Sequence, residues 1–197
     1  MLLSTGSSGR ISITAWPPNE DTLLILLNAL HSLNDRLQKE VGRNFFASSN
    51  FIALKALRNL FHHHTELIHE VKIIPVENLP PMVTDLLTVC LVPRTLIERA
   101  GTETDRKYRE QVRSAFDAFK WYGSIVNIQP CVFNVAVDVF ELVADLDAAP
   151  QSEAYLLFME SYRLEEQDGH DHRVTGDIWC GAGSVAEILG KVFHQTS

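Results

Sequence analysis

Four of the chain's eight histidines fall within one short stretch, from His62 to His69. This stretch directly follows Arg58 and Asn59 and also contains glutamates. At about 100° per residue, an ideal helix would sort these side chains into two neighbouring polar stripes. One stripe holds Arg58, His62, Thr65 and His69, and the other holds Asn59, His63, Glu66 and Glu70. Imidazole titrates near neutral pH and guanidinium binds phosphate, so the segment is suited to acid–base chemistry on an anionic substrate.

Arg58-Asn59-x-x-x-His63 resembles the R-N-x-x-x-H signature (Arg, four to six residues, His) of HEPN domains. These are helical, bundle-like domains, and many are metal-independent endoribonucleases of toxin–antitoxin, phage-defence and CRISPR-associated systems. The resemblance implies that Arg58 and His63 are the catalytic pair, with Asn59 assisting and without a cofactor. It implies a homodimer that brings both copies' motifs into one cleft, an RNA substrate, and an antitoxin or regulatory protein as partner. His62 and His64 stay open as alternates to His63.

The chemistry open to such a motif is RNA cleavage without a metal, in which the ribose 2′-OH attacks the adjacent phosphate. An imidazole can accept the 2′-OH proton or donate a proton to the leaving 5′-oxygen. A guanidinium can stabilise the charge that develops on the non-bridging oxygens. On one continuous helix, Arg58 and His63 would lie about 140° apart, which is awkward for a single phosphate.

Other interpretations of the same residues remain open. A non-catalytic helical interaction or regulatory module is the main alternative. The third is a metal-binding helical bundle, because His62, Glu66 and His69 share i, i+4, i+7 spacing. A second Glu-x-x-His motif, which a di-metal bundle needs, is missing from the sequence. The polar segment His170-Asp171-His172 could bind a cation, but it is more typical of an exposed loop.

Composition favours one folded domain. The chain has 197 residues, of which 46% are hydrophobic and 21% charged, and its formal net charge is -8. That charge has the wrong sign for broad electrostatic binding of nucleic acid, although a local basic site is compatible with it. Three cysteines without a paired spacing predict buried or free thiols in a reducing compartment. With neither a signal-peptide pattern nor a long apolar run, we expect a cytoplasmic protein without membrane contact.

Apolar periodicity predicts an all-α, HEPN-like, bundle-like domain of about six to eight helices. A flexible or extended arm is expected over residues 1–18, followed by a single domain over 19–197. Its core would span about 19–147, with a helical extension over 150–197. Helices are expected over 20–41, from about 49 to 72, and over 82–92, 94–100, 103–122, 130–147, 152–166 and 184–194. Residues 82–92 could also form a strand, and His64 is expected in the core.

Overall fold

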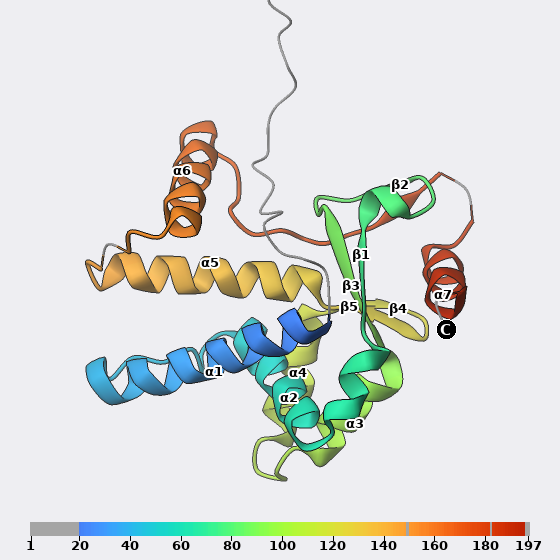
Figure 1. The fold of residues 1–197 in the computed structure, drawn as a ribbon, viewed down its shortest axis with the longest axis horizontal. Helices are drawn as coiled ribbons and strands as arrows, with labels where there is room; N and C mark the ends of the chain where they lie inside the picture. The colour runs from blue at the N-terminus through green and yellow to red at the C-terminus, as the bar shows by residue number, and fades with distance from the viewer. Residues whose placement is uncertain (1–19, 149, 182, 196–197) are drawn as a thin grey trace, which may run out of the picture.

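The computed structural model describes residues 20–148, 150–181 and 183–195, and the expected arm over 1–18 lies outside these ranges. The helices, shown in Figure 1, are α1 (Glu20–Val41), α2 (Ser49–His63), α3 (Arg94–Glu103), α4 (Arg109–Ala115), α5 (Gln129–Asp145), α6 (Glu153–Asp168) and α7 (Val185–Gln195). Short 3-10 helices are η1 (Thr65–Glu70), η2 (Val76–Asn78) and η3 (Phe116–Ala118). Among the described residues, no helix has both the length and the apolar character needed to cross a bilayer.

The fold is mainly helical but includes antiparallel sheet, so the all-α prediction is only partly correct. One sheet has the order β1-β3-β5-β4, formed by β1 (Lys72–Pro75), β3 (Thr88–Pro93), β5 (Ile125–Asn127) and β4 (Lys120–Tyr122). A second, two-stranded sheet pairs β2 (Met82–Val83) with β6 (Trp179–Cys180).

The helix predicted over 82–92 is wrong, and the alternative, a strand, is correct for residues 88–93. Val89 and Leu91 pack into one apolar cluster with Ile178 and Leu189, whereas Cys90 and Val92 pack into the main core. Because both faces of β3 are buried, the strand reads as a continuous apolar run without the alternation that marks a half-exposed strand.

The single helix predicted over 103–122 is also wrong. Here α3 ends at Glu103, α4 covers only Arg109–Ala115, and β4 begins at Lys120. Gly123, which directly follows the predicted helix, turns the β4–β5 hairpin with φ of +63°. A positive φ at the first turn residue favours the right-handed twist of a tight hairpin, and glycine adopts it without steric cost.

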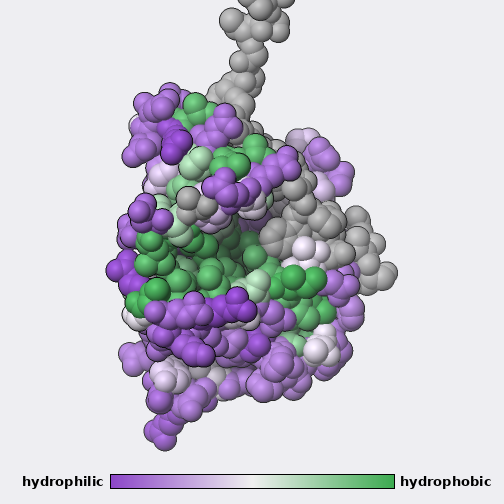
Figure 2. Space-filling view, turned by 60° about the vertical axis from the view of Figure 1, so that its left-hand side comes forward, coloured by the Kyte–Doolittle hydropathy of each residue, from purple (hydrophilic) through white to green (hydrophobic). Residues whose placement is uncertain are grey.

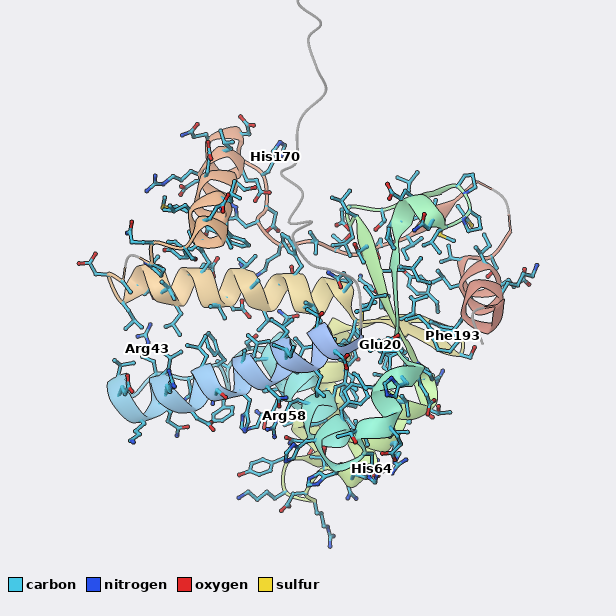
Figure 3. All side chains as sticks on the ribbon, viewed as in Figure 1. Glu20, Arg43, Arg58, His64, His170 and Phe193 are labelled. Carbon is cyan, nitrogen blue, oxygen red and sulfur yellow. The ribbon has the colours of Figure 1, made fainter. Side chains whose placement is uncertain are left out.

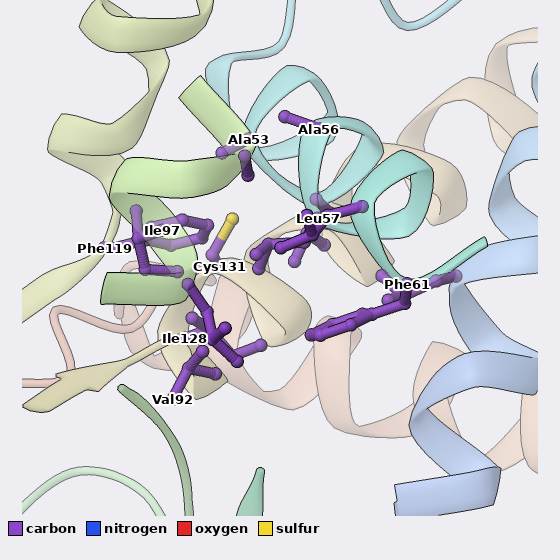
Figure 4. Packing of buried hydrophobic residues seen from close by; sticks show 14 of the residues in the cluster. Ala53, Ala56, Leu57, Phe61, Val92, Ile97, Phe119, Ile128 and Cys131 are labelled. Atoms are coloured by element: carbon purple, nitrogen blue, oxygen red, sulfur yellow. The ribbon is translucent and has the colours of Figure 1, made fainter. Parts of the chain in front are cut away.

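Helix α2 lies at the centre of the main core. Its buried face contains Phe51, Leu54, Leu57 and Phe61, and α1, α3, α4 and α5 all contact it. Figure 4 shows Leu57 near Cys131 of α5, with Ile97 of α3 on one side of them and Phe61 on the other. The predicted helices over 20–41, 130–147, 152–166 and 184–194 are confirmed within a few residues.

The two last helices occupy different places. Helix α7 covers the second apolar cluster, where Leu189 is buried against residues of the sheet. Helix α6 contains no buried residue and stands out from α5. Figure 2 shows apolar side chains gathered in a hollow on the side of the molecule to which the far ends of α1 and α5 belong.

Candidate functional site

The polar segment that begins at Arg58 does not form one helix. Helix α2 ends at His63, His64 leaves helical geometry with φ of -138°, and η1 and β1 follow. The expected helix to residue 72 is therefore wrong. Leu67, Ile68 and Val71 are still buried, so tertiary packing rather than helical periodicity places them. The two polar stripes are consequently valid only as far as His63.

Arg58 is held against α1. Its Nε donates a hydrogen bond to Oδ1 of Asn28 at 2.9 Å, and Nη1 lies 3.4 Å from Oδ1 of Asn59. Figure 3 places Arg58 beside α1, where polar side chains of α1 and α2 meet. Within the described residues, no protein acceptor is found for Nη2. The guanidinium is thus oriented by Asn28 while part of its donor edge stays available to a ligand.

His31 of α1 lies beside Arg58. The pKa of His31 is lowered, first by burial, and the charges of Arg58, Lys55 and His62 lower it further against the opposing effect of Asp35. Its Nδ1 is buried without a partner in the described chain, and its Nε2 lies 3.7 Å from Oδ2 of Asp35. His31 is therefore mainly neutral at pH 7, with Nε2 directed toward Asp35.

We call this group the α1–α2 polar seam: Asn28, His31 and Asp35 of α1 with Lys55, Arg58, Asn59 and His62 of α2. His31 and Lys55 also line one small cavity of about 10 Å³ between the two helices. The seam combines two imidazoles with two permanent cations, which is a composition suited to binding a phosphodiester.

His62 and His63 differ in their relation to Arg58. His62 lies one helical turn after Arg58, on the same side of α2, and its charge acts on His31. His63 is exposed at the last residue of α2, and its ring makes an edge contact with His62 at 5.6 Å between centroids. Of the two histidines at the end of α2, His62 is therefore the one that shares the seam with Arg58 within one chain.

His64 occupies a separate polar cluster, and its expected place in the core is wrong. Its Nε2 lies 2.8 Å from Nη2 of Arg99 and 3.2 Å from Oε2 of Glu103, both on α3. The hydrogen bond from Arg99 is the main cause that lowers the pKa of Glu103. Figure 3 shows His64 at the other end of this region from Arg58. His64 joins α2 to α3 and does not enter the α1–α2 polar seam.

The candidate metal ligands do not form a centre. His62 lies on α2, whereas Glu66 and His69 lie on η1, so the helical spacing that linked them is lost. No group of three or more His, Cys, Asp or Glu residues in the described ranges is placed to hold a metal ion. In the 170–172 loop, His172 stacks on Tyr162 at 3.5 Å and pairs with Glu165, which gives it a structural role.

The cysteines offer no nucleophile to the seam. Cys90 and Cys131 are buried free thiols, and burial raises the pKa of both. The buried thiols therefore stay protonated at neutral pH and pack as small apolar side chains.

Asn28 and His31 were not predicted as site residues. A signal for them is present, because Asn28, His31 and Asp35 recur at i, i+3, i+7 in a helix that is otherwise rich in leucine. That spacing marks a polar stripe on α1, but only the packing of α1 against α2 brings it to Arg58.

Comparisons with protein-family models, curated proteins and solved structures gave no match for this chain.

Proposed function

We propose that the protein is a HEPN-like, metal-independent endoribonuclease whose active site is the α1–α2 polar seam. One observation carries the proposal: Asn28 orients the Arg58 guanidinium beside His31 and His62. Burial and nearby positive charges favour the neutral form of His31. A neutral base, a second imidazole and a fixed cation are the groups that cleavage through the 2′-OH requires.

In the proposed mechanism, Nε2 of neutral His31 accepts the proton of the ribose 2′-OH. The 2′-oxygen then attacks the adjacent phosphorus, and the bond from phosphorus to the 5′-oxygen breaks. His62 donates a proton to the leaving 5′-oxygen, while Arg58 stabilises charge on the non-bridging oxygens. The products are a 2′,3′-cyclic phosphate and a 5′-hydroxyl. Lys55 and Asn59 are placed to bind flanking phosphates or sugars.

The HEPN resemblance adds a homodimer, in which Arg58 and His63 of both copies would share a cleft. It also adds an antitoxin or regulatory partner and a cytoplasmic setting, where RNA and reduced thiols coexist. These remain predictions. The shared cleft differs from the single-chain mechanism in one respect. It assigns the acid–base role to His63, whereas the single-chain mechanism assigns it to His62.

Cleavage of labelled total RNA in EDTA, by single variants, tests the proposal. We expect Arg58→Ala, His31→Ala and His62→Ala each to lower the rate at least about 100-fold, the scale of lost acid–base or charge stabilisation. Arg106→Ala, an exposed arginine outside the seam, is the matched control and should cleave like the wild type. Circular dichroism checks that every variant is folded.

The outcome for His63→Ala separates the two assignments. Loss of cleavage with His63→Ala and full activity with His62→Ala would support the shared cleft of the resembled family. Wild-type rates for Arg58→Ala and His31→Ala would show that the seam is not the site.

The second candidate function is a non-catalytic interaction module. It is favoured by the acidic net charge of -8 and by the exposed leucines of α6, which provide an apolar surface for a protein partner. This alternative predicts a folded protein that cleaves no RNA with or without EDTA.

A further inference from the structure

Helix α6 carries two apolar faces, and only one of them is used within the chain. Tyr155, Phe158 and Tyr162 contact Phe140 of α5, with ring centroids 4.8 to 5.4 Å apart. On the opposite face Leu156, Leu157 and Leu164 are 41%, 44% and 49% exposed. The helix geometry puts the two faces roughly 170° apart. An exposed apolar stripe of this kind on a 16-residue helix marks an interaction surface.

An open space of about 420 Å³ borders one side of α6 along Leu156, Met159, Glu160, Arg163, Leu164 and Gln167, all of which lie on this one helix. The spacing of these six residues is that of a helix seam, with steps of three, one, three, one and three. The six positions are also symmetric about the point between residues 161 and 162. Glu160 and Arg163 lie at the centre, Met159 and Leu164 flank them, and Leu156 and Gln167 lie at the ends.

We propose that this face binds the same face of a second copy, with the two α6 helices antiparallel about a two-fold axis near residues 161 and 162. In that arrangement Glu160 lies opposite the partner's Arg163, and Met159 and Leu164 flank the charged pair on the two edges of the interface. The two-fold axis repeats the contact, so the pair contains two opposite-charge contacts bordered by apolar side chains. A parallel pair would place like residues together and lose the charge complementarity.

Charge complementarity is the reason to choose a second copy as the occupant. Glu160 and Arg163 are both exposed, and neither forms an ion pair with another described residue. In the antiparallel pair each finds its opposite charge. The surface is short, about 24 Å for 16 residues at 1.5 Å each, so a weak dimer in the micromolar range is expected.

The pairing is independent of the proposed ribonuclease site. Figure 1 shows α6 standing out from α5 on the side away from α2, so the pairing leaves the α1–α2 polar seam uncovered. It therefore differs from the shared cleft implied by the HEPN resemblance. Failure of one proposal leaves the other intact.

Charge reversal on the full-length chain, measured by sedimentation velocity up to about 200 µM, tests the pairing. Glu160→Arg alone puts an arginine opposite the partner's Arg163 at both symmetry-related contacts. Arg163→Glu alone puts a glutamate opposite the partner's Glu160 at both contacts. We expect each variant to dimerise about tenfold more weakly than the wild type. An equal mixture of the two variants restores both opposite-charge contacts, so heterodimers should form with near wild-type affinity.

Arg106→Glu, an equal charge reversal at an exposed residue away from α6, is the control and should leave self-association unchanged. A wild-type chain that stays monomeric over the whole concentration range would overturn the proposal. So would single variants that associate as well as the wild type, or a mixture that fails to recover.

Discussion

The Arg58 guanidinium can stabilise a phosphate in a transition state only if its orientation is fixed beforehand. Asn28 supplies that orientation from the neighbouring helix, through a hydrogen bond of 2.9 Å to Nε. The same neighbours make His31 different from an exposed histidine, because burial and three nearby cations favour its neutral form. The motif predicted Arg58 with His63 and left His62 open as an alternate. Asn28 and His31 depend on how two helices pack, which spacing along one chain does not reveal.

The lowered pKa of His31 predicts a specific loss of stability in mild acid. The unfolded chain takes up a proton at a higher pH than the folded chain does, near the ordinary histidine value of about 6.5. The free energy of unfolding should therefore fall as the pH drops below that value, until folded His31 is itself protonated. His31→Asn removes this titration, so its stability should depend less on pH in the same window.

Urea denaturation at pH 7 and at pH 5.5 measures the effect. Glu103 and Asp177 have lowered pKa values, so the stability that they add is lost as the pH falls from the ordinary carboxyl range toward their lower folded pKa values, which is below the His31 window. An identical pH dependence for wild type and His31→Asn would contradict the assignment of a lowered pKa to His31.

The elements that could be predicted from sequence are those with one exposed face. Helices α1, α5, α6 and α7 follow their apolar periodicity closely. The strands were missed or ambiguous because β3 is buried on both faces and β4 and β5 are only three residues long. Such segments are specified by non-local pairing rather than by a local pattern. The early end of α2 has the same origin, because η1 and β1 are placed by their tertiary contacts.

The segment after α6 returns to the sheet through a tight contact at Gly176. Its φ is +69°, and an added Cβ would lie 1.9 Å from Cγ of Pro130 at the start of α5. Gly169, the C-cap of α6, has nearly the same φ of +70° but open space around it. Comparing substitutions at the two glycines therefore separates the free-energy cost of backbone strain from that of a steric clash.

Gly169→Ala should lower the free energy of unfolding by about 1 kcal/mol, the cost of a left-handed conformation for a residue with a Cβ. Gly176→Ala should lower it by about 3 kcal/mol or more, because the methyl group also forces Pro130 to move. Chemical denaturation of both variants measures the difference. Equal effects would show that loop 169–178 does not dock against α5 as described.

Over the whole molecule, the net charge and the fixed charges of the proposed site have opposite signs. The chain carries a net charge of -8, yet the α1–α2 polar seam brings together Lys55, Arg58 and two histidines. An acidic protein can bind RNA at such a local site, and the affinity should fall only shallowly with added salt because few phosphates are contacted. The outer face of α6 lies apart from this site, so self-association and RNA chemistry can be tested separately.

The most direct measurement is the chemistry of the ends produced when wild-type protein cleaves RNA in EDTA. Attack by the 2′-OH predicts 2′,3′-cyclic phosphate and 5′-hydroxyl ends, detected by mass spectrometry of a defined oligonucleotide. A substrate with one 2′-deoxyribose at the cleaved position should resist cleavage there. Ends with a 3′-hydroxyl and a 5′-phosphate, or cleavage that needs a divalent metal, would contradict the proposed mechanism.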